Sequence, residues 1–195
     1  MWIRPGAYAG VLAVTSMLMV PLTIPILPAE TFVKINTAAG GLVAESTRNE
    51  NDLTSQLPQH FADRYGWKEM TAAVAQAYEE LSPEEKMQAC ILTGNYGEAG
   101  ALDLYGAEAG LPRIISGANS LWARGYGDFE PGTVIVVGFE RGYADKFFGQ
   151  CEPVGFVTNR YDVKNEESTR HTGLYVCRQP RRSWSELWQD MQWFQ

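Results

Sequence analysis

The sequence predicts an α/β fold: a three-layer α/β/α soluble domain preceded by one N-terminal transmembrane helix. Three stretches carry this prediction. Ala89–Trp122 reads as strand, helix and strand in quick succession, the order of a β-α-β unit. Thr133–Phe139 is a continuous, β-branched apolar run, which is typical of a strand covered on both faces. Pro5–Pro28 holds no charged residue across 24 positions, and a membrane-spanning helix needs about 20 apolar residues.

Length and composition are those of a folded, acidic protein. The chain has 195 residues, of which 45% are hydrophobic and 20% charged, so we expect one domain with a sizeable core. The formal net charge is -7 at pH 7. A nucleic-acid partner would need a basic face for its phosphates, and this charge argues against that class of function.

Residues 1–30 form the predicted membrane span. Arg4 precedes the uncharged stretch, and the positive-inside rule then puts the N-terminus in the cytoplasm and the remainder outside. Pro21, Pro25 and Pro28 are expected to kink or end the helix near the membrane interface. A cleaved signal peptide would have a shorter apolar core and an Ala-x-Ala site, and a buried core helix would be shorter too. We therefore expect a bilayer-anchored chain with its domain on the extracytoplasmic side.

The segment after the span is predicted to connect it to the folded domain. Residues 31–57 are polar and lack steady periodicity, which is typical of a surface connector, and residues 58–195 form the domain. Apolar residues at three- and four-residue steps predict a helix over Trp67–Leu81. Pro83-Glu84-Glu85 can begin a further turn.

The central unit places two loops at one edge of the sheet. Ala89–Thr93 is predicted as a buried strand, and a glycine-rich turn leads into a helix over Glu98–Leu104 that stops at Gly106. A second strand over Arg113–Ile115 is followed by the loop Ser116–Trp122. In open α/β sheets ligands bind at the edge where such loops leave the strands.

The remaining elements complete the layered fold. Ser183 and Glu186 have the spacing of a capping box and predict a last helix. A short helix and two more strands, joined by a polar loop, precede it: Arg141–Phe148, Glu152–Thr158, Gly173–Cys177 and the loop Asn159–Thr172.

Cysteine spacing predicts no metal site. Cys90, Cys151 and Cys177 each lie in or beside an apolar run, without a C-x-x-C pair or a nearby histidine. We expect core packing for all three. A Cys151–Cys177 bridge is the alternative if the domain faces an oxidising compartment.

The glycines of the central unit do not predict a nucleotide cofactor. Gly94, Gly97 and Gly100 follow a strand as in dinucleotide-binding motifs, but Glu98 stands where the phosphate would lie. No acidic residue ends the second strand to bind a ribose. The chain also lacks a G-x-S-x-G nucleophile motif, and its two histidines lie outside the unit. We predict neither a cofactor nor a catalytic residue.

The two loops carry amide, carboxylate and aromatic side chains. Amides and carboxylates hydrogen-bond hydroxyl groups, and an aromatic face stacks against a sugar ring or a prenyl chain. The alternative roles are structural: a turn asparagine, a core tryptophan and an acid that suits the helix dipole. The candidate substrate-binding residues are Asn95, Tyr96, Gly97, Glu98, Asn119 and Trp122.

Four segments together resemble a known family. LPQHFADRYGW, ILTGNYGEAGALDLYG, GLPRIISGANSLW and VIVVG are similar to the C-terminal region of bacterial glycosyltransferase family 39-like membrane proteins, relatives of protein mannosyltransferases and lipid A aminoarabinose transferases. The six candidate residues are the matched positions. Ala118 stands where the family has histidine, and Ala123-Arg124-Gly125 replaces a Trp-Gly.

The resemblance implies the C-terminal part of a GT-C enzyme. Such an enzyme uses a polyprenyl-phosphate sugar as donor and a glycan or peptide as acceptor, and its catalytic acid would lie upstream of Met1. We therefore expect the last span and the extracytoplasmic domain of a glycosyltransferase, not catalytic alone. A stand-alone, single-pass module that binds a glycan or lipid head group is the alternative, and a self-sufficient enzyme using Glu98 is a third.

Overall fold

The computed structural model describes residues 5–24, 26–41, 57–160 and 163–194. The chain forms two compact units, Met1–Arg64 and Tyr65–Gln195. Most of the predicted connector, residues 42–56, lies outside the described residues.

The first unit is helical. It contains α1 (Pro5–Thr23), α2 (Ala29–Ala38) and α4 (Gln59–Ala62), and the rings of Phe32 and Phe61 pack 4.5 Å apart. Helix α2 includes residues 31–38, so the predicted connector begins with a helix. Its buried positions, Ala29, Phe32 and Asn36, follow helical spacing, but the intervening polar residues hide that pattern.

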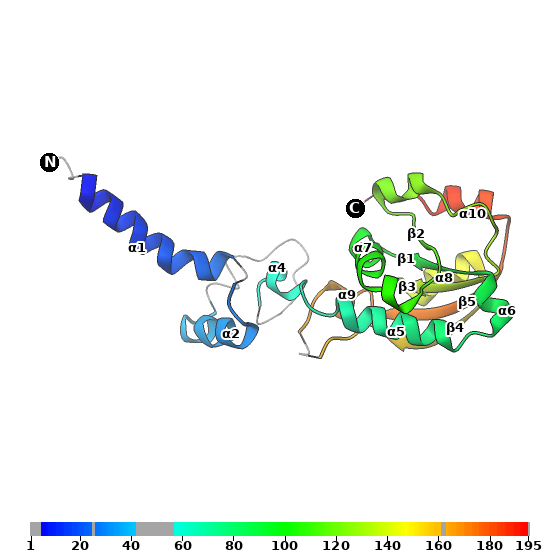
Figure 1. The fold of residues 1–195 in the computed structure, drawn as a ribbon, viewed down its shortest axis with the longest axis horizontal. Helices are drawn as coiled ribbons and strands as arrows, with labels where there is room; N and C mark the ends of the chain where they lie inside the picture. Colours follow the sequence, from blue (N-terminus) through cyan, green and yellow to red (C-terminus); the bar gives the residue numbers. More distant parts are fainter. Residues whose placement is uncertain (1–4, 25, 42–56, 161–162, 195) are drawn as a thin grey trace. The chain divides into compact units, whose positions relative to one another are not determined.

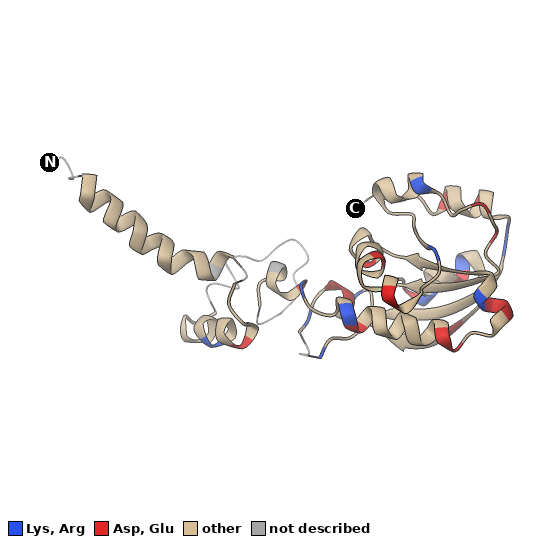
Figure 2. Cartoon of the chain, in the orientation of Figure 1, with Lys and Arg blue, Asp and Glu red and all other residues tan. Residues whose placement is uncertain are grey.

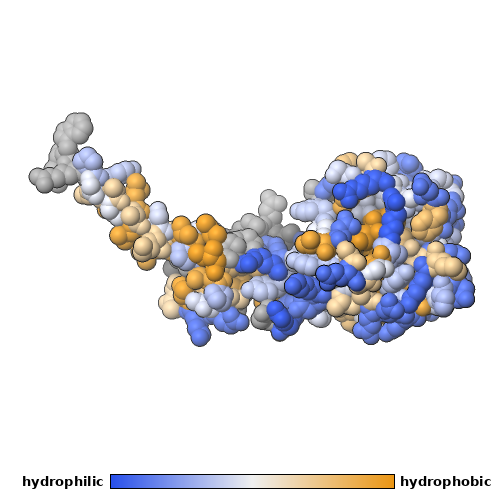
Figure 3. All heavy atoms as spheres, in the orientation of Figure 1, coloured by the Kyte–Doolittle hydropathy of each residue, from blue (hydrophilic) through white to orange (hydrophobic). Residues whose placement is uncertain are grey.

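Helix α1 carries no charged side chain, as Figure 2 shows. Its apolar side chains are exposed, with Val11 at 64% and Met17 at 80%, and Figure 3 shows apolar surface along it. Among the described residues, however, no helix has the length and apolar character needed to cross a bilayer. The span predicted for residues 1–30 is therefore not supported.

The second unit is built on a mixed five-stranded sheet in the order β2-β1-β3-β5-β4 (Figure 1). Strands β1, β2 and β3 are parallel, β5 runs antiparallel to β3, and β4 antiparallel to β5. The α/β prediction is confirmed. The strands are β1 (Ala89–Thr93), β2 (Ile114–Ser116), β3 (Thr133–Val137), β4 (Phe148–Phe156) and β5 (Gly173–Pro180).

Helices cover both faces of the sheet. Successive residues of a strand point to opposite faces, so each face packs its own set of side chains against helices. On β3, Ile135 and Val137 pack with α5 (Trp67–Glu79) and α7 (Tyr96–Tyr105). Val134 and Val136 pack with the other pair of helices, α8 (Arg141–Phe147) and α10 (Trp184–Asp190). The shorter helices are α6 (Pro83–Met87), η1 (Ala107–Ala109), η2 (Asn119–Arg124) and α9 (Glu166–Thr169).

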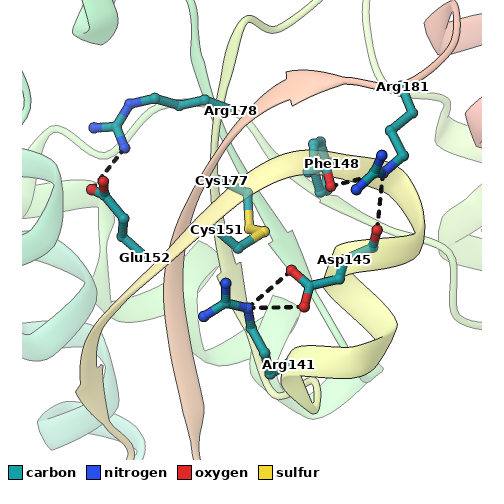
Figure 4. Close-up of a disulfide and its surroundings, with 8 residues drawn as sticks. All are labelled: Arg141, Asp145, Phe148, Cys151, Glu152, Cys177, Arg178 and Arg181. Atoms are coloured by element: carbon teal, nitrogen blue, oxygen red, sulfur yellow. Dashed lines mark hydrogen bonds and ion pairs between the residues drawn. A yellow bond between two sulfur atoms is a disulfide. The ribbon is translucent and has the colours of Figure 1, made fainter.

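A disulfide joins β4 to β5. Cys151 and Cys177 are directly paired across the two strands, with Cα atoms 4.1 Å apart, and both are buried (Figure 4). On the strands beside the bridge, Arg178 forms an ion pair with Glu152 at 3.0 Å. Both cysteines lie in the core, as expected, but they also form the bridge that was the alternative. Cys90 is a buried free thiol.

Candidate functional site

Three parallel strands and the start of an antiparallel one meet at one edge of the sheet. Thr93 pairs with Ser116 on β2 and with Val137 on β3, so β1, β2 and β3 end side by side. Strand β5 begins at the same edge, because Leu174 pairs with Val137. The residues just before β5 are therefore brought to the edge where α/β sheets bind ligands.

Two glycines let the loops approach closely at this edge. A Cβ atom on Gly138, which has φ +78°, would lie 1.9 Å from Oε1 of Glu98. A Cβ atom on Gly94 would lie 2.7 Å from the carbonyl oxygen of Gly138. The Glu98 carboxyl group consequently sits directly against the ends of β1 and β3.

Glu98 belongs to a capping box at the start of α7. The backbone N–H of Glu98 donates to Oδ1 of Asn95 at 2.8 Å. In return, Oε2 of Glu98 accepts from the N–H groups of Gly94 and Asn95 at 2.8 and 3.1 Å. This local motif fixes the orientation of the carboxyl group.

The other oxygen of Glu98 has a different environment. The side chain is fully buried, and within the described part of the chain Oε1 has no hydrogen-bond partner. Burial raises the pKa of Glu98 to about 8, more than the two backbone hydrogen bonds lower it, and the charges of Glu167 and Glu166 raise it further. A pKa of about 8 means that the carboxyl group is mainly protonated at neutral pH.

His171 faces this carboxyl group. Its Nδ1 lies 3.8 Å from Oε1 of Glu98, and its Nε2 lies 3.5 Å from Oε1 of Glu166. Nδ1 is buried and, among the described residues, has no hydrogen-bond partner. A histidine and an acid thus face each other across a distance too long for a direct hydrogen bond.

A pocket of about 670 Å³ opens at this edge, a size usual for small-molecule sites. Gly94, Gly138 and His171 are among its walls, together with Glu140, Thr169 and Arg170. The aromatic part of the wall consists of Phe139, Tyr143 and Trp193.

The aromatic wall is held in place by packing and by the C-terminal segment. The rings of Phe139 and Tyr143 are stacked, with centroids 4.4 Å apart and planes inclined by 3°. Trp193 donates its backbone N–H to Gly117 at 3.0 Å, and its carbonyl accepts from Asn119 at 2.9 Å. Aromatic faces beside polar atoms suit a ligand with one apolar face and several hydroxyl groups.

The residues predicted from the first loop are placed around α7. Asn95 caps the helix, Tyr96 is 61% exposed, and Gly97 allows close packing because its Cβ would lie 3.0 Å from the Trp67 ring. None of the four residues predicted from this loop lines the pocket. Glu98 is buried beside Gly94 and Gly138, which do line it.

Asn119 and Trp122, predicted from the second loop, support the C-terminal segment. Asn119 has φ 50° and holds Trp193 through its backbone, as described above. Trp122 and Trp188 exchange hydrogen bonds, each indole N–H donating to the other's carbonyl at 2.8 and 3.1 Å. Both loops leave the predicted edge, but neither residue lines the pocket: Asn119 binds the wall residue Trp193, and Trp122 binds Trp188 on α10.

Sequence reasoning missed His171, Trp193, Phe139 and Tyr143. His171 lies two residues before a predicted strand. That position is at this edge of the sheet only if the strand runs antiparallel to its neighbour, as β5 does. Trp193 gave no comparable local signal, since its place depends on the pairing of the chain end with Ala118.

Comparison with known proteins adds no assignment to this site. No family model, curated protein or solved structure matched the chain.

Proposed function

We propose that this chain is the extracytoplasmic domain of a polyprenyl-phosphate-sugar-dependent glycosyltransferase of the family 39-like group, and that it binds sugar without being catalytic alone. The observation that carries the proposal is the aromatic-walled pocket at the carboxyl edge of β1 and β3, with His171 in its wall and the buried carboxyl group of Glu98 beside the wall residue Gly138. The NYGEAGA segment, part of the sequence resemblance, supplies Glu98.

Two further features support a place outside the cytoplasm and beside a membrane. The Cys151–Cys177 disulfide is of a kind that persists in oxidising compartments. The uncharged, exposed helix α1 suits contact with the lipid bilayer or with other apolar segments of such an enzyme.

Binding of a lipid-linked sugar to the full chain tests the proposal. The purified protein in detergent is titrated with a short-chain polyprenyl-phosphate mannose, and binding is followed by tryptophan fluorescence. We expect saturable binding that Tyr143→Ser weakens about tenfold, because the substitution removes one ring of the stacked wall.

Leu104→Ser is the matched control, since Leu104 is 69% exposed on α7 and outside the pocket. It should bind as the unchanged protein does, and circular dichroism should show that both variants fold. Equal binding by the two variants would count against the pocket. Sugar transfer by this chain alone, abolished by Glu98→Gln, would instead favour a self-sufficient enzyme.

A further inference from the structure

A second cavity lies at the opposite end of α7 from the aromatic-walled pocket. It is formed where the end of α7, the segment leading into β2 and the end of η2 meet, and its volume is about 420 Å³, a size usual for small-molecule sites. The two cavities share no lining residue. Helix α7 has ten residues and rises about 15 Å, so the second cavity is a separate site.

Three charged residues line the second cavity: Asp103, Arg113 and Arg124. The side chains of Arg124 and Asp103 are 68% and 57% exposed, and Arg113 is exposed as well, so a ligand can reach them. Two positive charges and one negative charge leave this wall with a net charge of +1, in a chain whose net charge is -7. A local excess of positive charge in a concave surface favours an anion.

Arg113 is held in place without losing its charge. Its Nη2 donates to the carbonyl oxygens of Arg124 and Gly125 at 3.3 and 3.5 Å. Gly127, which has φ +117°, lies against the side chain, because a Cβ there would be 3.3 Å from both Cδ and Nε of Arg113. Carbonyl groups accept hydrogen bonds but carry no negative charge, so they orient the guanidinium group and do not neutralise it.

The ion pair between Arg124 and Asp103 is weak. Nη1 of Arg124 lies 3.7 Å from Oδ2 of Asp103, and both side chains are open to solvent. Such exposed pairs contribute little free energy. An anion with two negative charges attracts Arg124 more strongly than the single charge of Asp103 does, so it can take the place of Asp103 beside the arginine.

We propose that the second cavity binds a phosphate monoester, whose phosphate group contacts Arg113 and Arg124. Guanidinium groups bind phosphate oxygens through charge-assisted hydrogen bonds, often in pairs. The half-buried side chains of Leu111, Pro112 and Ile114 form an apolar part of the wall beside the charged one. They suit a ligand with an apolar group next to its phosphate. This inference does not depend on the proposed function, because it concerns a different cavity.

Calorimetric titration of the full chain in detergent with phenyl phosphate tests this inference. The second pKa of a phosphate monoester is about 6, so the ligand is mainly dianionic at a pH of about 7.5. We expect saturable binding that Arg113→Gln and Arg124→Gln each weaken about tenfold, because each substitution removes one charge-assisted contact. Benzoate, with one negative charge, and inorganic phosphate, without an apolar group, should each bind about tenfold more weakly than phenyl phosphate.

Asp103→Asn should have the opposite effect on binding. It removes the acid that competes for Arg124, so phenyl phosphate should bind about threefold more tightly. Arg182→Gln is the matched control, since Arg182 forms another exposed ion pair, with Asp190, and lines neither cavity. It should leave binding unchanged, and circular dichroism should show that all four variants fold.

Cosedimentation with vesicles separates a lipid head group from a soluble ligand, since both can present a phosphate monoester. Phosphatidylcholine vesicles are compared with vesicles that also contain phosphatidic acid. Additional binding to phosphatidic acid that Arg113→Gln abolishes identifies a lipid, whereas equal binding to both kinds of vesicle identifies a soluble phosphate ester.

Several outcomes of the calorimetric titrations would overturn the inference. These are no saturable binding of phenyl phosphate, equal affinity for benzoate, or equal losses in the three arginine variants, which would mean that overall charge alone attracts the anion. Unchanged or weaker binding by Asp103→Asn would overturn it as well, because the anion would then not replace Asp103 beside Arg124. None of these results affects Tyr143-dependent binding of the lipid-linked sugar, which tests the proposed function separately.

Discussion

Two helices of this domain begin with the same motif, yet their glutamates have opposite properties. At α6, Ser82 and Glu85 form a capping box in which Oε2 of Glu85 accepts from the Ser82 N–H at 3.0 Å. At α7, Asn95 and Glu98 form another, with the corresponding distance 3.1 Å. The local backbone geometry is therefore nearly equivalent.

The second carboxylate oxygen makes the difference. Oε1 of Glu85 accepts from Nε of Arg178 at 2.6 Å, and the pKa of Glu85 is lowered by the Ser82 backbone hydrogen bond first and by Arg178 second. Oε1 of Glu98 is buried and, in the described part of the chain, has no hydrogen-bond partner, and burial raises the pKa of Glu98 to about 8. A capping motif thus predicts the start of a helix, whereas tertiary surroundings decide the charge of its acid.

The largest effect is expected where the sheet edge meets Glu98. Gly138→Ala should lower the free energy of unfolding by about 3 kcal/mol or more, because a Cβ there meets Oε1 of Glu98 and the residue has φ +78°. Urea denaturation followed by circular dichroism measures the loss. In a Glu98→Ala background the loss caused by the steric clash should vanish. Gly138→Ala should then cost about 1–2 kcal/mol, because its backbone conformation still disfavours a side chain.

Gly142→Ala is the control for this substitution, since a Cβ at Gly142 meets nothing within 4 Å. It should cause no loss of stability and should stabilise the protein by up to about 1 kcal/mol, because Gly142 lies in helix α8. A similar loss in both variants, or no coupling between Gly138 and Glu98, would show that the carboxyl group is not held against the strand end.

Removal of the capping acid should lower the free energy of unfolding more at α7 than at α6. Glu98→Ala should cost about 2–3 kcal/mol, because it leaves the buried N–H of Asn95 without its acceptor and opens a cavity. Glu85→Ala should cost only about 1 kcal/mol, as expected for a partly exposed cap. Thermal and urea unfolding of both variants measure this, and equal losses would contradict the contrast drawn from burial.

Much of the fold was predictable from local pattern. Strand Ala89–Thr93 has the predicted bounds, because a short apolar run buried on both faces ends at an unmistakable turn. The last helix begins after Ser183, as its capping box predicts. Strand β4 was predicted to start at Glu152 but starts at Phe148, since α8 passes straight into it without a turn residue.

The sequence predicts a residue of the candidate site only where the contacts that position it are close in the sequence. Glu98 is identified from the loop that follows the first strand, because both its capping partner and its strand are close in sequence. His171 and Trp193 reach the pocket through pairings that no local pattern encodes: the direction of β5 and the pairing of the chain end with Ala118. The disulfide likewise depends on the register of β4 and β5.

The pH dependence of stability should also differ between the two acids. The pKa of Glu98 rises from its ordinary value of 4.5 to about 8 on folding, so the stability gained from its neutral form is complete below 4.5 and is lost as pH rises to about 8. In that window the contribution of Glu98 falls by at most about 1.4 kcal/mol per pH unit.

Urea titrations at several pH values between 5 and 9 test this, with Glu98→Gln as the reference that cannot ionise. As pH rises to about 8, the free energy of unfolding of the unchanged protein should fall relative to that of Glu98→Gln. Above that pH the difference between the two should level off. Parallel stability curves for the two proteins would mean that Glu98 is already charged at neutral pH.

The smallest effect is expected at the capping box of α6, which is only partly buried. Arg178→Gln should cost less than about 1 kcal/mol, because the side chains of Arg178 and Glu85 are 28% and 27% exposed and solvent screens the pair. The pKa of Glu85 is lowered on folding, so its contribution is present above 4.5 and is lost as pH falls through the lower, folded value. Added salt should reduce the cost of Arg178→Gln but leave that of Glu98→Ala unchanged, since ions do not reach a buried carboxyl group. Equal salt sensitivity in unfolding experiments would mean that Glu98 is accessible to solvent, and the distinction between the two capping boxes would then fail.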